Sequence, residues 1–313
     1  MQKFERTKEE ADRLTAGLWG LLVASAFGQA REAMRKDPPS DAHIRHRIPG
    51  MSWGIEGAQV LCLLTALQRS GAVTQEWAER AVDWARLGIY FPESEHRFIE
   101  LDGPLVTPHL HGESYAALEG YHRQAIKQSA LLFMVPFLRA RFGTDVSLGR
   151  EMLALCAPGI HDDMDKATLI AGMLWSRALV SGHPNAWHQA AFGLGALAFE
   201  LNITKASVDT VLGTSPGGIS YQTPHRLLYL LVQARQEVEM THTFSQAVDL
   251  ASAPEPEFRI PMPLTGAFAG MRYGMSGIDP KWIAVLRGRE LAKNCIDACT
   301  KVHFILEARG VGV

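Results

Sequence analysis

Residues that could carry out chemistry are concentrated in a few polar stretches of an otherwise apolar chain. The densest is His161-Asp162-Asp163-Met164-Asp165, which places an imidazole beside three carboxylates. Carboxylates near a histidine permit proton transfer close to neutral pH, and the same groups could bind a cation. The stretch also begins a predicted helix, so Asp162 or Asp163 could serve as its N-cap, with His161 exposed to solvent.

A second stretch, His109-Leu110-His111-Gly112-Glu113, has the spacing H-x-H-x-E. These side chains could bind zinc if the loop is extended and a further ligand comes from elsewhere in the chain. Histidines at alternate positions of a polar loop are also common without a metal. Both interpretations stay open.

A third stretch, residues 253–280, joins a proline-rich, charged segment to a helix of small residues. The first half carries Glu257 and Arg259, and the second half carries Gly266, Gly270 and Gly274 at intervals of four. Glycines at this spacing let another backbone approach closely, and a charged irregular entry to such a helix is typical of a site. The alternative is that two core helices simply touch here.

Composition excludes several classes of partner. Hydrophobic residues make up 47% of the chain and charged residues 20%, which predicts a globular protein with a sizeable core. The formal net charge of −2 gives no electrostatic bias toward nucleic acid or an acidic membrane. The charged N-terminus lacks the apolar region of a signal peptide, and no apolar run reaches membrane-spanning length, so we expect a cytoplasmic protein.

The cysteines form no C-x-x-C pair and lie in apolar helical contexts, which predicts buried, reduced thiols. They are Cys62, Cys156, Cys295 and Cys299.

Helical periodicity dominates the elements that must position these groups, and strand signals are scarce. The first predicted helix covers 7–30, with Thr7 as N-cap, Glu10 three residues later and an end near Gly28. Polar loops are expected at 36–50 and 90–115. No linker or repeat divides the chain, so we expect one all-α domain over residues 1–313. The remaining predicted helices are 57–70, 75–89, 114–141, 147–156, 163–181, 185–201, 204–212, 222–238, 243–252, 264–276 and 280–305.

Five blocks, taken together and in order, resemble the ADP-ribosylglycohydrolase family, which includes the dinitrogenase-reductase-activating glycohydrolases, the ADP-ribosyl-acceptor hydrolases and the J1 crystallins. The most specific is T-G-A-F-A-G-M-R-Y-G-x-x-G-I-D-P-K-W. The resemblance implies an all-α, multi-helix orthogonal bundle of the ADP-ribosylglycohydrolase type. The blocks are residues 17–30, 52–67, 130–137, His161 and 265–282.

Active members of that family hold two magnesium ions through a T-D-D-T and a D-x-D-T motif, and this chain departs from both. Alignment of the blocks places Gly54-Ile55-Glu56-Gly57 at the first motif and Glu257-Phe258-Arg259-Ile260 at the second. Glycine, isoleucine and phenylalanine offer no oxygen ligand from a side chain, and arginine is a fixed cation. We therefore expect a rebuilt site without a metal or other cofactor.

The resemblance also implies which residues meet in the cleft. Glu56 and Glu257 are the candidate catalytic carboxylates, with His161 as a further candidate. Arg259 could replace part of the lost metal charge, although it could instead form a structural ion pair with either glutamate. The remaining candidate ligand-binding residues are Gln29 and Gln128, at positions where the family's polar residues stand, and Tyr115 and Tyr121, which could stack on a base or sugar or simply pack.

Three functions follow as hypotheses. The first is a metal-free cleft that acts on or binds an ADP-ribose-like, nucleoside or other glycosidic small molecule. The second is a non-catalytic pseudoenzyme with a binding or regulatory role. The third is a conventional magnesium-dependent hydrolase, which requires the motif alignment to be wrong. The sequence predicts neither the ligand's identity nor an oligomeric state.

Overall fold

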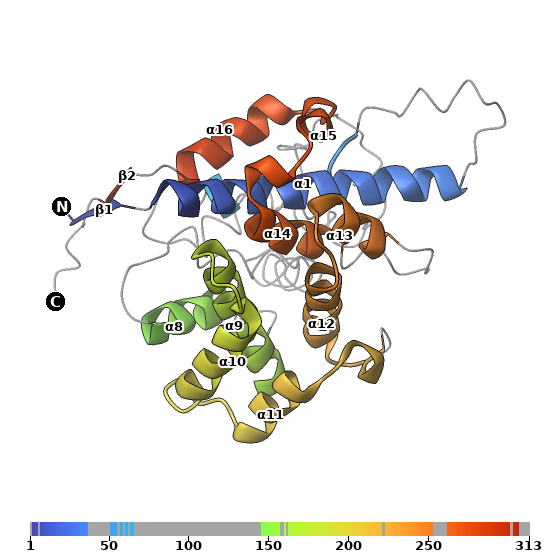
Figure 1. Cartoon of the computed structure of the whole chain (residues 1–313). Coiled ribbons are helices and arrows are strands. Elements are labelled where there is room, and N and C mark those ends of the chain that lie inside the picture. The colour runs from blue at the N-terminus through green and yellow to red at the C-terminus, as the bar shows by residue number, and fades with distance from the viewer. Residues whose placement is uncertain are drawn as a thin grey trace, which may run out of the picture.

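A computed structural model describes residues 2–5, 7–36, 51–54, 57, 58, 60, 61, 63–65, 145–156, 160, 162–220, 223–252, 262–300 and 303–306. Within these ranges the protein is almost entirely helical, with one antiparallel pair of short strands (Figure 1). The predicted all-α class is confirmed. The predicted single domain over residues 1–313 stays a prediction.

The described elements, in chain order, are β1 (Gln2–Glu5), α1 (Lys8–Lys36), α8 (Asp145–Cys156), α9 (Asp163–Val180), α10 (Ala186–Leu197), α11 (Lys205–Gly213), the 3-10 turn η4 (Pro216–Gly218), α12 (Arg226–Glu239), α13 (Phe244–Ala251), α14 (Met262–Tyr273), the 3-10 turn η5 (Met275–Gly277), α15 (Pro280–Ala284), α16 (Arg289–Thr300) and β2 (His303–Leu306). The helices predicted between residues 147 and 276 agree with α8 to α14 to within about one helical turn.

Helix α1 starts where the sequence predicts but ends later. The backbone N–H of Thr7 donates to Glu10 Oε2 at 3.0 Å, and the N–H of Glu10 donates to Thr7 Oγ1 at 3.1 Å, so the predicted capping box is present. The predicted end near Gly28 is wrong, because the helix continues to Lys36. Gly28 makes room for a neighbour instead, since a Cβ atom there would lie 3.1 Å from Met262 Sδ.

The centre of the fold is the crossing of α1 and α14. A Cβ atom added at Gly266 would lie 2.2 Å from the carbonyl oxygen of Gly20, and one at Gly270 would lie 2.1 Å from the carbonyl oxygen of Ala16. The two helices therefore pack backbone against backbone, as the spacing of the glycines predicts. Buried leucines of α1 surround the crossing, and Figure 1 shows α14 lying directly against α1.

The C-terminal region differs from its prediction. The predicted helix 280–305 is wrong: it is interrupted after α15 at Gly288, whose φ of +74° favours glycine, and it ends at Thr300. Residues 303–306 form β2 instead, which pairs with β1 so that Gln2 lies opposite Leu306. This pairing joins the two ends of the described chain, which lie on the same side of the molecule in Figure 1.

Helices α12 and α14 meet around one buried acidic side chain. Thr265 Oγ1 donates a hydrogen bond to Glu237 Oε2, and both residues are buried. Burial raises the pKa of the Glu237 carboxyl to about 8, although the hydrogen bond from Thr265 acts in the opposite direction. The carboxyl is therefore mostly protonated at neutral pH, which lets it lie inside an apolar core.

Two further sequence predictions can be compared with the structure. Cys295 and Cys299 are buried free thiols, as expected, and burial raises the pKa of Cys295. None of the described helices is both long and apolar enough to span a bilayer. The helices predicted at 75–89 and 114–141, and the loop predicted at 90–115, lie outside the described residues.

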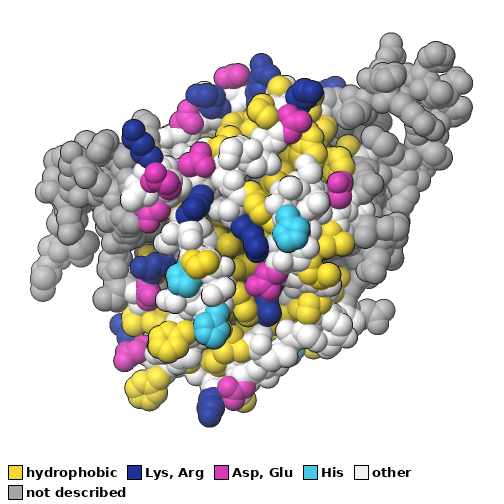
Figure 2. Space-filling model, viewed as in Figure 1, with side chains coloured by type: hydrophobic (Ala, Val, Ile, Leu, Met, Phe, Trp, Pro, Cys, Tyr) yellow, Lys and Arg dark blue, Asp and Glu magenta, His cyan; other side chains and the backbone are white. Residues whose placement is uncertain are grey.

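Figure 2 shows the same side of the molecule as Figure 1. Toward the centre of this view, charged side chains and histidines lie among apolar ones on the surface.

Candidate functional site

The N-terminal end of α9 carries the acidic stretch that the sequence singles out. Asp162 is the N-cap of α9, and its Oδ1 accepts a hydrogen bond from the backbone N–H of Asp165 at 2.9 Å. The N-cap predicted for this stretch is therefore confirmed at Asp162. Helix starts favour carboxylates because their free N–H groups carry partial positive charge.

Asp163 is oriented differently. Its Oδ1 accepts from Lys166 Nζ at 2.8 Å, and its Oδ2 accepts from the backbone N–H of Thr204 at 3.3 Å, just before α11. The Lys166 hydrogen bond and charge, together with the bond from Thr204, hold the pKa of the Asp163 carboxyl below its usual range, although desolvation opposes them. Asp163 therefore links the start of α9 to the start of α11.

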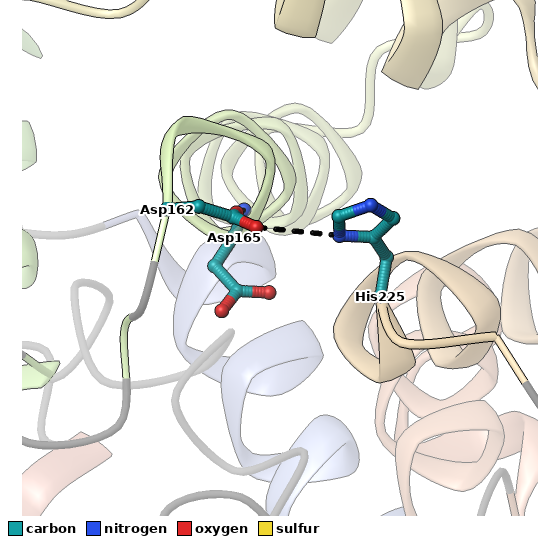
Figure 3. Close-up of side chains that lie close together, drawn as sticks. All are labelled: Asp162, Asp165 and His225. Atoms are coloured by element: carbon teal, nitrogen blue, oxygen red, sulfur yellow. Dashed lines mark hydrogen bonds and ion pairs between the residues drawn. The ribbon is translucent and has the colours of Figure 1, made fainter.

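His225 joins Asp162 and Asp165 from the other side. It precedes α12 as its N-cap, and its Nδ1 lies 3.5 Å from Asp162 Oδ2 (Figure 3). One ligand atom from each of Asp162, Asp165 and His225 lies within 4.8 Å of the other two. We call these three residues the α9 cluster. Asp165 is buried, whereas the other two side chains are partly exposed, so solvent and small solutes can reach the cluster.

The α9 cluster supports two kinds of chemistry. Two carboxylates and an imidazole form a mixed oxygen and nitrogen donor set for a divalent cation. Alternatively, a carboxylate next to Nδ1 favours the imidazole tautomer that carries its proton there, which leaves Nε2 free to accept a proton from a bound molecule. Helix capping by Asp162 is compatible with either.

Local structure explains how His225 reaches this position. The residue follows Pro224, and its backbone N–H donates to Thr223 Oγ1 at 3.2 Å, which fixes the turn before α12. Helices α9 and α12 pack side by side, so their starts can bring side chains together. Sequence reasoning missed His225, because nothing local marks a histidine at the start of an apolar helix as a partner of a distant aspartate.

Most of the residues that the sequence nominates lie outside the described residues. The backbone of Gln29 lies in α1, but its side chain is not described. The structure therefore does not test the predicted roles of Gln29 or of the residues outside the described ranges. The latter are Glu56, Glu257, His161, Arg259, Gln128, Tyr115, Tyr121, His109, His111 and Glu113.

The flanks of several of these residues nevertheless come together. The backbone N–H of Gly54 donates to Ser25 Oγ of α1 at 3.0 Å, and a Cβ atom at Gly57 would lie 2.6 Å from Trp53 Cβ. Met262, the first residue of α14, lies against Gly28. Gly54, two residues before Glu56, and Met262, two residues after the 257–260 motif, thus both contact α1, at Ser25 and Gly28.

Comparison with known proteins identifies the fold. A solved structure described as an ADP-ribosylglycohydrolase-related protein complex matches with a TM-score of 0.61 and 20% sequence identity, over 95% of this chain and 99% of that one. No protein-family model and no curated protein matches the sequence. At this identity the likeness shows the fold, so the predicted resemblance is confirmed at that level: the chain has the ADP-ribosylglycohydrolase fold.

Proposed function

We propose that this protein is a divergent member of the ADP-ribosylglycohydrolase family whose cleft takes an ADP-ribose-like, nucleoside or other glycosidic small molecule without a pair of magnesium ions. The observation that carries the proposal is the combination of a fold shared along nearly the whole chain with two glycines, Gly54 and Gly57, at positions of a metal-binding motif. Neither glycine can supply a side-chain oxygen to a cation.

The packing around α1 supports the position of the cleft. Ser25 holds Gly54, the first residue of one rebuilt motif, and Gly28 contacts Met262, which follows the other motif in sequence. In the proposal, the two motifs therefore lie along neighbouring turns of α1. In the proposal, Glu56 or Glu257 acts as base or as the carboxylate that orients the ligand. Arg259 supplies a fixed positive charge in place of a metal.

The other nominated residues complete the cleft. Gln29 and Gln128 donate hydrogen bonds to hydroxyl groups of the ligand, while Tyr115 and Tyr121 stack on its base or sugar. His161 precedes the α9 cluster directly in sequence, so this end of α9 contributes the groups that transfer protons. His225, fixed by Asp162, is the described residue best suited to that task.

A thermal-shift screen tests the proposal. ADP-ribose, NAD, nucleosides and sugar phosphates are each added to the full chain, with magnesium and with a chelator. We expect one ligand class to raise Tm by at least a few degrees, equally in both conditions, because a ligand that binds only the folded state stabilises it. Arg259→Ala should abolish that shift, whereas Arg150→Ala, an exposed position on α8, should retain it.

The other outcomes separate the competing functions. A shift that requires magnesium, with chelator-sensitive release of ADP-ribose from an arginine-linked substrate, would establish a conventional magnesium-dependent hydrolase. Absence of any shift would favour a non-catalytic protein with a regulatory role.

The contribution of the α9 cluster needs a separate variant. If the screen yields a substrate, His225→Asn should lower kcat by about 100-fold or more, since general acid–base catalysis contributes about that much, and leave the ligand-induced Tm shift in place. His242→Asn, an exposed histidine before α13, is the matched control and should leave kcat unchanged. Equal rates in the two variants would exclude His225 from the reaction.

A further inference from the structure

A cavity of about 740 Å³ opens at the opposite end of α9 from the α9 cluster. Its wall consists of the loop from Gly182 to Asn185, the first turn of α10, the C-terminal part of α9 and residues of α1, α12 and α14. This volume falls within the range of small-molecule sites. We call it the Arg13 cavity, after the α1 residue that lines it.

Two arginines give the Arg13 cavity an excess of positive charge. Arg13 and Arg272 both line it, and neither forms an ion pair with a carboxylate of any described residue. The cavity's one lining carboxylate, Glu239, is already paired, because its Oε2 lies 3.0 Å from Arg235 Nε. The charge of Glu239 is thereby offset, and no carboxylate in the described part of the chain pairs with either guanidinium group.

The position of Arg13 is set by its surroundings. Its Nη1 donates to the carbonyl oxygen of Val180 at 3.3 Å. The same nitrogen lies over Gly182, where an added Cβ atom would be 1.9 Å away, and the φ of Gly182 is +71°. Any larger residue at this turn would displace the guanidinium, so the loop is shaped to hold Arg13 at the cavity wall.

The apolar side of the cavity is equally well supported. Trp187 packs edge-on against the buried Trp175, with ring centroids 5.9 Å apart. The guanidinium of Arg235 covers the Trp187 ring at 4.4 Å from its centroid. Asn185 precedes α10 without forming a side-chain cap, and residues 185–188 line the cavity, so the start of α10 adjoins it. Two arginines and the aromatic side chain of Trp187 thus line the same cavity.

We infer that the Arg13 cavity binds the phosphate or carboxylate group of a small organic anion. Guanidinium groups form charge-assisted, often bidentate hydrogen bonds with both kinds of oxyanion. Along α9, Asp165 of the α9 cluster and Trp175 of the cavity wall are ten residues apart, which corresponds to about 15 Å. The inference is therefore independent of the proposed cleft, and the two sites can be occupied separately.

Calorimetric titration of the full chain with pyrophosphate, and separately with citrate, tests the inference. Sodium chloride keeps the ionic strength equal throughout. We expect at least one anion to bind with one-to-one stoichiometry, and Arg13→Gln and Arg272→Gln each to weaken its Kd by about tenfold or more. Arg150→Gln, on α8, is the matched loss of a positive charge outside the cavity and should leave Kd within about twofold.

The two probes identify the preferred group. Binding of pyrophosphate alone assigns a phosphate ligand, and binding of citrate alone assigns a carboxylate. Arg259→Ala, in the proposed cleft, should not change either Kd. The inference is overturned if neither anion binds, if Arg272→Gln binds as tightly as the unaltered chain, or if Arg259→Ala abolishes binding. If Arg13→Gln unfolds the protein, the Kd of Arg272→Gln still tests the inference, because Arg272 is exposed.

Discussion

The crossing of α1 and α14 and the α9 cluster are held by opposite kinds of interaction. At the crossing, backbones touch and no side chain lies between Gly20 and Gly266. At the α9 cluster, three polar side chains from two helices meet, and two of them are partly exposed. A side chain added at the crossing would clash with backbone, whereas we expect the α9 cluster to tolerate substitution of one polar residue by another. The fold is thus fixed by steric fit and its chemistry by a few replaceable side chains.

Glu237 lies between these two extremes. Its carboxyl is polar like the α9 cluster but buried like the crossing, and it contacts Thr265 of α14, beside Gly266. Its raised pKa keeps it neutral, so it belongs with the steric scaffold at neutral pH and becomes a buried charge only in alkali.

The comparison is tested most severely by an added methyl group at the crossing. Gly266→Ala should lower the free energy of unfolding by about 4 kcal/mol or more, because the new Cβ atom meets backbone that cannot move aside. Gly195→Ala in α10, where nothing lies within 4 Å of the new atom, should instead stabilise by about 0.5–1 kcal/mol. Urea unfolding of both variants measures the difference, and equal effects would contradict the steric account.

Glu237→Gln sharpens the comparison through pH. The folded pKa of about 8 lies above the ordinary value, so the folded state holds its proton more tightly than the unfolded state. Stability from this group is full below the ordinary pKa and is lost as pH rises toward about 8. Glutamine stays neutral, so the free energy of unfolding of the variant should exceed that of the unaltered chain by about 4 kcal/mol at pH 8 and by about 1 kcal/mol or less at pH 5.

Urea unfolding of Glu237→Gln and the unaltered chain at pH 5, 6.5 and 8 measures this difference. A constant offset between the two proteins across that range would show that Glu237 does not change its protonation on folding.

The smallest effect is expected at the α9 cluster. Asp162→Ala removes the N-cap of α9 and should cost about 1 kcal/mol of stability, whereas Asp162→Asn keeps the cap and should cost only a few tenths. Thermal unfolding of the two variants makes the comparison. A loss of several kcal/mol in either one would mean that the α9 cluster is part of the scaffold.

The sequence predicts what depends on neighbours along the chain. The capping box of Thr7 and Glu10, the N-cap at Asp162 and the glycine spacing of α14 are local patterns, and all three appear in the structure. The end of α1 was missed because Gly28 has two possible meanings. A glycine can stop a helix or admit a neighbour, and only the position of Met262 decides between them.

The rest depends on contacts between distant segments. Nothing near His225 indicates that it meets Asp162, and nothing in residues 222–238 shows that Glu237 is buried against Thr265. Strands β1 and β2 lie at opposite ends of the sequence and are too short to give a period of their own. Arg13 and Arg272 likewise line one cavity only because α1 packs against α14, so no local motif predicts the cavity.

The crossing of α1 and α14 also has a consequence for how the protein folds. Of the 313 residues, 245 lie between Gly20 and Gly266, so this contact closes a very long loop and forms slowly. During synthesis, α1 is complete long before α14 leaves the ribosome, so its leucine-rich surface lacks its main packing partner. Aggregation of the nascent chain, or its retention by chaperones, should therefore continue until residues 262–273 have been made.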